Sequence, residues 1–367
     1  MLVLSNDQKM LMESARGAIA AKAPVSEFRK LRLDSHGDGF SRAFWRECAE
    51  LGWAGVLVPE EFGGIDFGAV GAGLIAREMA RTLTLSPFLS SSVLSASALG
   101  RAASPAEKAE WLPRIARGEA IVAFALDEGA RAGAVSTKAT RAATGWRLDG
   151  AKHFVLDGHV ADAFVIAADV EGDAALFLTK ADAPGVSRDT RTLVDGRRVA
   201  SLKLEGVSVG GAARLAGGAP TIEDVADIGR AVLSAALCGV AEEAFSRTMR
   251  YLKERRQFDR RIGSFQALQH RAARMHIDIE NAWSASLKAL QSIEGRANSA
   301  PLDVAIAKAK ASETACAAAA ECLQMHGGIG MTDEFDIGLF LKRARVDAVL
   351  LGDAAFHADR VATMLGY

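Results

Sequence analysis

The stretch AVLSAALCGVAEEAFSRTMRYLKERR, Ala231–Arg256, indicates the fold most directly. Its apolar residues recur at three- and four-residue intervals, which predicts one long helix that begins near Thr221 and Asp224. Helical periodicity continues in three further segments, Ser264–Ile293, Asp303–Met325 and Asp333–Leu365. The last of these is expected to break at Gly352. Long amphipathic helices with short connections predict a C-terminal four-helix bundle over residues 220–367.

Upstream of the bundle, from about Ile121, the sequence consists of short apolar or alternating runs broken by Gly and Asp. The runs are IVAFAL, GWRLDG, HFVLDG, AFVIAA, ALFLTK, RVASLKL and GVSV. This spacing predicts a compact antiparallel β domain, a small β-barrel, over residues 121–215. The glycine-rich VGGAARLAGGAP that closes it is expected to be a loop.

The first 120 residues carry helix signals. Ser5 and Gln8 form a capping box before a periodic stretch that extends to about Lys22. Ser41 can cap the next helix, and others are expected over Val70–Arg81 and near Ser91–Ala102. A further N-terminal helix signal is given by Ser104, Pro105 and Glu107. The expected fold class is therefore α+β and multidomain: an N-terminal all-α domain (1–120), a middle antiparallel β-barrel and a C-terminal four-helix bundle.

Half of the 367 residues are hydrophobic and the formal net charge is −1, so no overall field favours nucleic acid or anionic lipid. No apolar run reaches the length of a membrane span, and the N-terminus lacks the basic region of a signal peptide. We therefore expect a cytoplasmic protein that binds neither nucleic acid nor membrane. The cysteines offer no metal-ligand spacing and are expected to be buried free thiols: Cys48, Cys238, Cys316 and Cys322.

Three segments carry motifs that are more specific than the helix and strand patterns. The first is YLKERRQFDRRIGSFQALQH, Tyr251–His270, which resembles the acyl-CoA dehydrogenase signature in which Arg-x-x-Phe is followed by Ile, Phe-Gln and Gln. QMHGGIGMTDEF, Gln324–Phe335, resembles the family's Gln-x-x-Gly-Gly-x-Gly segment, and VPEEFGG, Val58–Gly64, resembles its Pro-Glu-x-x-Gly-Gly loop. The motifs agree with the family in order and spacing, so the resemblance spans nearly the whole chain.

The resemblance implies an FAD site shared between two subunits. Arg255 would supply a permanent positive charge for the FAD pyrophosphate, and Phe258 an apolar face. Gly327 and Gly328 would let the main chain approach the cofactor, because they lack a Cβ atom. In the family these elements reach the adenosine-pyrophosphate end of the partner's FAD. The residues carried over are Arg255, Gln257, Phe258, Gln324, Gly327 and Gly328.

The half of the site that holds the flavin ring is altered relative to the family. Where the family reads Thr-Glu-Pro, this chain has Asp127-Glu128-Gly129, and the glycine- and serine-bearing loop that follows is shorter. Where the family reads Lys-x-Trp-Ile-Thr, this chain has Phe154 at the tryptophan position and Leu156 at the threonine position. Phe154 keeps an aromatic ring, whereas Leu156 cannot donate a hydrogen bond.

The family's catalytic glutamate is also missing. Dehydrogenation of a thioester needs a carboxylate to take the α-proton. Most of the family carries it before Gly-Thr near the C-terminus, and that position is Leu351 here. A second group carries it on the first helix of the bundle, where this chain has Gly229, flanked by Asp227 and Arg230, which the family uses near the substrate.

Three accounts of this absence are open. Asp353 could serve as a shorter base, although an Asp after Gly is also a common helix N-cap, and His357 one turn further on could titrate. Alternatively, the chain is the base-poor subunit of a heteromer like those of some bacterial family members. The third account is another flavin reaction, that of an oxidase or monooxygenase. A non-enzymatic helical scaffold is the alternative from another class.

The function implied by the resemblance is FAD-dependent α,β-dehydrogenation of an acyl-CoA substrate, with electrons passed to an electron-transfer flavoprotein. The implied assembly is a homodimer or tetramer, or a heterotetramer with a related subunit. No motif reports the length or identity of the acyl group.

Overall fold

The structure is a computed structural model that describes residues 3–34, 36–129 and 135–367. Its contacts divide the chain into two compact units. The helical unit comprises Met1–Arg29, Ala69–Thr84 and Arg230–Tyr367. The sheet unit comprises Lys30–Gly68 and Leu85–Gly229. Each unit is described by itself below.

The first part of the chain is helical, as predicted. Both predicted capping boxes are present, because Ser5 accepts from Gln8 N and Ser104 accepts from Glu107 N, each with the reciprocal bond. The predicted Ser91–Ala102 helix begins instead in a π-helix, Phe88–Ser95, a wider turn that sequence periodicity does not reveal. The α-helices are α1 (Asn6–Lys22), α2 (Val25–Leu33), α3 (Arg42–Glu50), α4 (Gly68–Arg81), α5 (Ala96–Ala102) and α6 (Pro105–Ala116).

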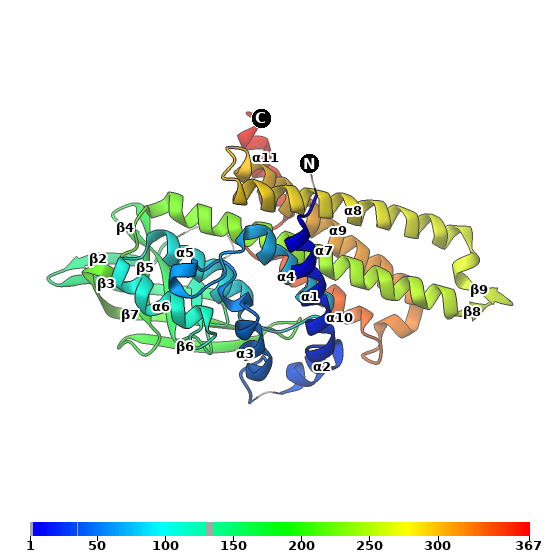
Figure 1. Ribbon diagram of the computed structural model, residues 1–367, viewed down its shortest axis with the longest axis horizontal. Helices are drawn as coiled ribbons and strands as arrows, with labels where there is room; N and C mark the ends of the chain where they lie inside the picture. Colours follow the sequence, from blue (N-terminus) through cyan, green and yellow to red (C-terminus); the bar gives the residue numbers. More distant parts are fainter. Residues whose placement is uncertain (1–2, 35, 130–134) are drawn as a thin grey trace. The chain divides into compact units, whose positions relative to one another are not determined.

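The middle of the chain forms a curled seven-stranded sheet, which confirms the predicted β domain (Figure 1). The strands are β1 (Val122–Ala125), β2 (Lys138–Ala142), β3 (Gly145–Leu156), β4 (Ala163–Val170), β5 (Asp173–Lys180), β6 (Val186–Thr192) and β7 (Arg198–Gly210). Their order is β1-β4-β2-β3-β7-β6, with β5 paired to β4.

Two pairings in this sheet are parallel, β1 with β4 and β2 with β4, whereas the other four are antiparallel. The β2–β3 hairpin separates β1 from β4 in the sequence, and a parallel pair needs such a long intervening connection. The inward side chains of the sheet include Trp146, whose ring lies edge-on to Phe177 with 5.5 Å between centroids. The predicted closing loop is shorter than expected, because β7 extends to Gly210.

The C-terminal helices are α7 (Gly218–Glu254), α8 (Gln266–Glu294), α9 (Ala300–His326), α10 (Ile337–Val349) and α11 (Ala354–Met364). The predicted break at Gly352 is confirmed, since α10 and α11 flank it. Helix α7 begins three residues before the predicted Thr221, and α10 begins at Ile337 rather than Asp333. In Figure 1, α7, α8 and α9 run side by side in the helical unit.

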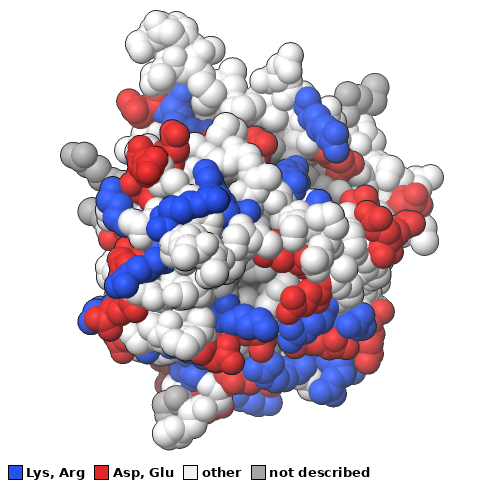
Figure 2. Space-filling model, turned by 90° about the vertical axis from the view of Figure 1, so that its left-hand side faces the viewer, with Lys and Arg blue, Asp and Glu red and all other residues white. Residues whose placement is uncertain are grey.

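Helix α4 packs closely against α7 and α8 because a glycine lies at each contact. A Cβ atom added at Gly239 of α7 would lie 2.2 Å from the carbonyl oxygen of Arg77, and one added at Gly73 would lie 2.4 Å from Leu290. No helix in the described part of the chain is long and apolar enough to cross a membrane. On the face drawn in Figure 2, acidic and basic side chains are interspersed, so no field of a single sign covers that face.

Candidate functional site

A short hairpin, β8 (Arg256–Gln257) and β9 (Arg260–Arg261), joins α7 to α8. Phe258 and Asp259 at its tip have φ angles of 54° and 60°, as a tight two-residue hairpin turn requires. Phe258 is 85% exposed. Its ring makes an edge-to-face contact with the ring of Phe265. An exposed aromatic ring at the tip of a turn is available to contact another molecule.

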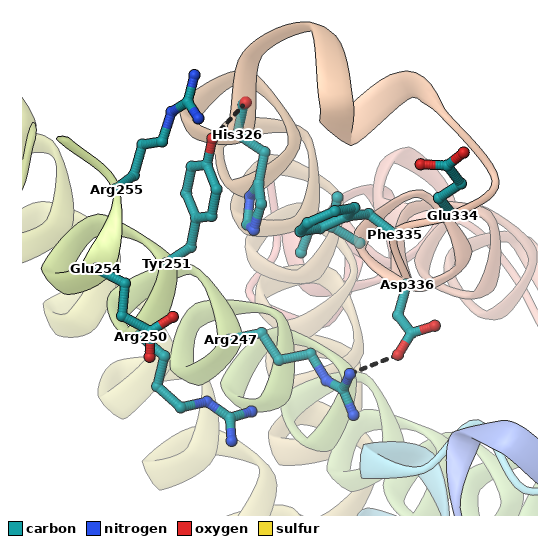
Figure 3. Close-up of a pocket in the computed structure, with 10 residues that line it drawn as sticks. Arg247, Arg250, Tyr251, Glu254, Arg255, His326, Glu334, Phe335 and Asp336 are labelled. Carbon is teal, nitrogen blue, oxygen red and sulfur yellow. Dashed lines mark hydrogen bonds and ion pairs between the residues drawn. The ribbon is translucent and has the colours of Figure 1, made fainter. Parts of the chain in front are cut away.

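Arg255 lies at the base of this hairpin, beside a cavity of about 720 Å³ (Figure 3). In the same cavity, the ring of Tyr251 stacks on His326 with 4.4 Å between centroids, and its hydroxyl donates to the His326 carbonyl oxygen. Arg247 is neutralised there by an ion pair of 2.6 Å with Asp336. The contact of Tyr251 with His326 joins the end of α7 to the end of α9, so the two predicted cofactor motifs meet.

The end of α9 is open to solvent. Gln324, Gly327 and Gly328 are exposed, and a Cβ atom added at either glycine would meet nothing within 4 Å. Gly327 has φ 66° and ψ −147°, a conformation that only glycine adopts readily. The main chain here can therefore be approached closely by a ligand.

In the sheet unit, the segment predicted to hold the flavin ring is stabilised by a buried ion pair. Lys152 is fully buried, and its Nζ donates to the Leu126 carbonyl oxygen at 3.1 Å and to Glu128 Oε1 at 2.5 Å. Glu128 also accepts from the amide groups of Ser136 and Thr137. Burial alone would raise the pKa of Glu128, but these hydrogen bonds outweigh it and lower the pKa to about 2. Glu128 is therefore an ionised structural group.

A bulge in β3 lies beside the Asp127 segment. The amide of His153 donates to the Asp127 carbonyl oxygen at 2.8 Å, and the pairing of β3 with β7 shifts between Lys152 and Val155. Phe154 has φ 54°, and its side chain is 54% exposed. The bulge thus turns this aromatic ring out of the sheet. Leu156, two residues on, is partly buried, and the shortened loop at residues 130–134 lies outside the described residues.

The predicted substrate-binding residues on α7 are buried. Asp227 is 4% exposed and Arg230 is 3% exposed. The Nε atom of Arg230 donates to the carbonyl oxygen of Leu351 at 3.0 Å. Gly229, the vacated base position on α7, is buried as well.

The turn between α10 and α11 contains the other vacated base position. Leu351 and Gly352 have φ angles of 57° and 103°, so both lie in the left-handed half of conformational space. A Cβ atom added at Gly352 would lie 2.4 Å from Phe356, and therefore this position accepts only glycine. Asp353 is the N-cap of α11, because its Oδ1 accepts from the amide of Phe356 at 2.8 Å.

Two residues around this turn have roles that the sequence did not indicate. Lys308 of α9 is fully buried, and burial lowers its pKa to about 7. His357 is also fully buried, and burial together with the charges of Arg230 and Lys308 lowers its pKa to about 3. The neutral His357 contacts the Leu351 carbonyl oxygen through Nε2 at 3.1 Å, so that nitrogen carries the hydrogen. His357 is therefore a buried donor and not the titrating base that its position allowed.

All four cysteines are free thiols, and Cys48, Cys238 and Cys322 are buried as expected, whereas Cys316 is only partly buried. Burial raises the pKa of Cys48, Cys238 and Cys322 to about 12, so these side chains stay protonated. Within residues 3–34, 36–129 and 135–367, no group of three or more His, Cys, Asp or Glu side chains could hold a metal ion.

Residues 5–119 match the family described as "Acyl-CoA dehydrogenase, N-terminal domain", and residues 216–366 match "Acyl-CoA dehydrogenase, C-terminal domain". Acyl-CoA dehydrogenase FadE27 of Mycobacterium tuberculosis is 32% identical over 337 residues, which cover 90% of this chain and 89% of that protein. A chain of the ChsE4-ChsE5 complex from Mycobacterium tuberculosis superimposes with a TM-score of 0.92 at 28% identity, covering 100% of this chain and 98% of that one. The Tcur3481-Tcur3483 steroid ACAD variant gives a TM-score of 0.91 at 27% identity, covering 98% of this chain and 97% of its own.

Proposed function

This chain belongs to the acyl-CoA dehydrogenase family, and on that premise we propose that it takes part in the α,β-dehydrogenation of an acyl-CoA thioester. In this oxidation of a CH–CH group, a carboxylate removes the α-proton while hydride leaves the β-carbon. FAD, when bound, would accept the hydride, and an electron-transfer flavoprotein would then take the electrons. The enzyme's part is to hold the acyl-CoA and the FAD next to a carboxylate base.

The residues at the ends of α7 and α9 fit the pyrophosphate end of FAD. Arg255 supplies a cation, and the exposed main chain at Gly327 and Gly328 leaves room for close approach. Phe258 is displayed away from its own chain. We propose that these residues, with Gln257 and Gln324, hold the FAD of a neighbouring subunit. The proposal requires at least a dimer, either of this chain or with a related one.

The opposite half of the site fits a flavin ring less well. Phe154 is turned out of the sheet and can offer an aromatic face, but Leu156 offers no hydrogen-bond donor. The Asp127 carbonyl oxygen is already used by His153. We propose that Asp127, Phe154 and Leu156 make few favourable contacts with a flavin ring. The complete flavin site of the assembly is then in the partner subunit, where this chain contributes the residues near the pyrophosphate.

The observation that carries this assignment is the turn at Leu351 and Gly352, which is held by hydrogen bonds from Arg230 and His357 but presents no carboxylate at the family's base position. Asp353 is nearby but is already used as a helix cap. The similarity to a chain of the ChsE4-ChsE5 complex supports an assembly of unlike subunits. We therefore propose the base-poor subunit of a heteromeric enzyme, with a lipid or steroid acyl-CoA as substrate. Its free, buried thiols are compatible with the reducing cytoplasm.

The test is to assay the purified chain alone and together with a glutamate-bearing family member encoded beside it, using several acyl-CoA thioesters and a dye acceptor. We expect turnover by the pair and a rate about 10²–10⁴-fold lower for the chain alone, the usual cost of a missing general base. Full activity of the chain alone would contradict the heteromer.

The vacant base position also leaves room for a flavin oxidase or monooxygenase, or for a subunit without catalysis of its own. Oxygen consumption by the purified protein with substrate would identify the first class. A colourless protein that binds no FAD, alone or with its partner, would identify a scaffold.

A further inference from the structure

The turn between α10 and α11, residues 350–353, is held almost entirely through its main-chain carbonyl groups. Donors reach it from three other places in the helical unit: Lys308 on α9, Arg230 on α7 and His357 on α11. The side chain of Leu351 takes no part in these bonds. The main-chain conformation of the turn therefore does not depend on which side chain stands at position 351.

Lys308 makes the largest contribution to this arrangement. Its Nζ donates to the Ala348 carbonyl oxygen at 3.0 Å, to the Gly352 carbonyl oxygen at 2.9 Å and to Ser312 Oγ at 3.1 Å. Ala348 lies in the last turn of α10, whose carbonyl groups have no helical partner. One ammonium group therefore connects the end of α10 to the residue before the N-cap of α11.

The Leu351 carbonyl oxygen, between these points, accepts from Arg230 Nε at 3.0 Å and from His357 Nε2 at 3.1 Å. Every donor in the group is at least 97% buried, so water does not compete for these bonds. Leu351 has a positive φ angle, which a non-glycine residue keeps only where surrounding contacts enforce it.

We propose that Lys308 is a positioning residue for the reaction: it holds the α10–α11 turn so that the side chain at position 351 is presented to the acyl group, whatever that side chain is. This inference rests on the proposed function for the identity of the substrate. It adds that the main chain of the turn already has the conformation that a base at position 351 needs, so that the single substitution Leu351→Glu supplies a working base.

A glutamate at position 351 gives the proposal a chemical readout separate from flavin reduction. Its carboxylate would take the α-proton of a bound acyl-CoA, and the resulting enolate would take a deuteron back from the carboxyl group once that group has exchanged with D₂O. This exchange leaves the substrate otherwise unchanged and needs no oxidant. It is followed by mass spectrometry of the acyl-CoA in D₂O with butyryl-CoA as the probe, using the FAD-loaded assembly in which the partner's own base is changed from Glu to Gln, so that exchange at position 351 is measured alone.

The experiment compares Leu351→Glu alone with the same variant carrying Lys308→Met, Lys308→Arg or Lys310→Met. Lys310 is the matched control, since it lies on the same helix but pairs with Asp278 at the surface. We expect Lys308→Met to slow α-proton exchange by about 10²-fold, the cost of a misplacement near 1 Å, while the dissociation constant of butyryl-CoA changes by less than about twofold. Lys308→Arg, which keeps donors for the carbonyl groups, should retain most of the rate, and Lys310→Met all of it.

A second readout tests the turn without substrate. The amides of Leu350, Phe356 and His357 are hydrogen-bonded at the borders of the turn. In the wild-type background, Lys308→Met should speed their hydrogen exchange about tenfold relative to the α8 amides, and Lys310→Met should not. If Lys308→Met does not fold, Ser312→Ala, which removes one of its acceptors, is measured in its place with a smaller increase expected.

Unchanged amide exchange in the Lys308→Met variant would overturn the positioning role. Equal α-proton exchange with and without Lys308 would overturn it too, as would a Leu351→Glu variant that binds butyryl-CoA but exchanges no α-proton. Failure to bind butyryl-CoA and longer or steroid acyl-CoA thioesters alike would contradict the proposed function, and the amide measurement would still decide the role of Lys308.

Discussion

Arg230 and Leu351 are joined by a hydrogen bond of 3.0 Å, from the guanidinium Nε to the main-chain carbonyl oxygen, although they are 121 positions apart in the sequence. Arg230 directly follows Gly229, one of the two vacated base positions, and Leu351 is the other. A helix of the bundle and the turn between α10 and α11 are therefore in direct contact where the base would be expected. The contact is present, whereas neither position carries a carboxylate.

The role of Asp353 can be tested with two substitutions that separate capping from proton transfer. Asp353→Asn keeps a good N-cap for α11 but removes the carboxylate, whereas Asp353→Ala removes both. We expect Asp353→Ala to lower the free energy of unfolding by about 1 kcal/mol and Asp353→Asn to leave it nearly unchanged. Because the partner supplies the base in our proposal, neither substitution should change turnover by the pair, measured with a dye acceptor. A collapse of activity in Asp353→Asn would make Asp353 the base.

Arg255 can be tested through cofactor retention. Arg255→Ala should weaken FAD binding by about 1.5–3 kcal/mol, the range for a hydrogen bond to a charged group. Flavin absorbance after dilution and gel filtration measures the loss. Arg250→Ala is the matched control, since Arg250 borders the same cavity but lies 3.8 Å from Glu243. Equal flavin content in wild type and Arg255→Ala would remove Arg255 from the site.

The buried pair of Lys152 and Glu128 should be important for the stability of the sheet unit. Lys152→Met would leave the buried carboxylate of Glu128 without its cation, and breaking a buried pair in this way typically costs about 3–5 kcal/mol. Lys138→Met is the control, because the Lys138–Asp169 pair involves a lysine side chain that is 64% exposed and should cost no more than about 1 kcal/mol. Urea denaturation of both variants measures the difference. Similar losses in the free energy of unfolding for the two variants would show that other groups stabilise the charge of Glu128 when Lys152 is absent.

His357 should make the fold sensitive to acid. Its pKa is about 3 in the folded chain and near 6.5 when unfolded, so between these values the unfolded chain binds more protons. The free energy of unfolding should therefore fall as the pH is lowered from 6.5 towards 3, and the contribution is complete above pH 6.5. His357→Gln does not titrate and can still donate to the Leu351 carbonyl oxygen. We expect a smaller loss of stability between pH 7 and 5 in this variant, and parallel profiles would contradict the assignment.

Local signals in the sequence predicted local structure well. The Ser5–Gln8 and Ser104–Glu107 capping boxes and the helix break at Gly352 depend on residues within a few positions of one another, and each is present. The family motifs around Arg255 and Gln324 were recognised from their sequences alone. That these two segments lie together follows from the stacking of Tyr251 on His326.

Features that depend on distant contacts were missed. Lys308 occurs in AIAKAKAS, where Lys308 and Lys310 look alike, yet one is fully buried and the other forms a surface pair. The difference comes from carbonyl groups 40 and 44 positions away. The parallel pairing of β1 with β4 and the ion pair of Lys152 with Glu128 likewise need partners that no local pattern names.

Gly352 has a consequence for any attempt to redesign this chain. A side chain at that position would meet Phe356 at 2.4 Å and His357 at 2.9 Å, in a conformation that L-residues avoid. In this turn, positions 351 and 353 can carry a side chain, whereas position 352 between them must remain glycine. Asp353 already caps α11. A catalytic acid would therefore be introduced into this turn by substituting a single residue, Leu351.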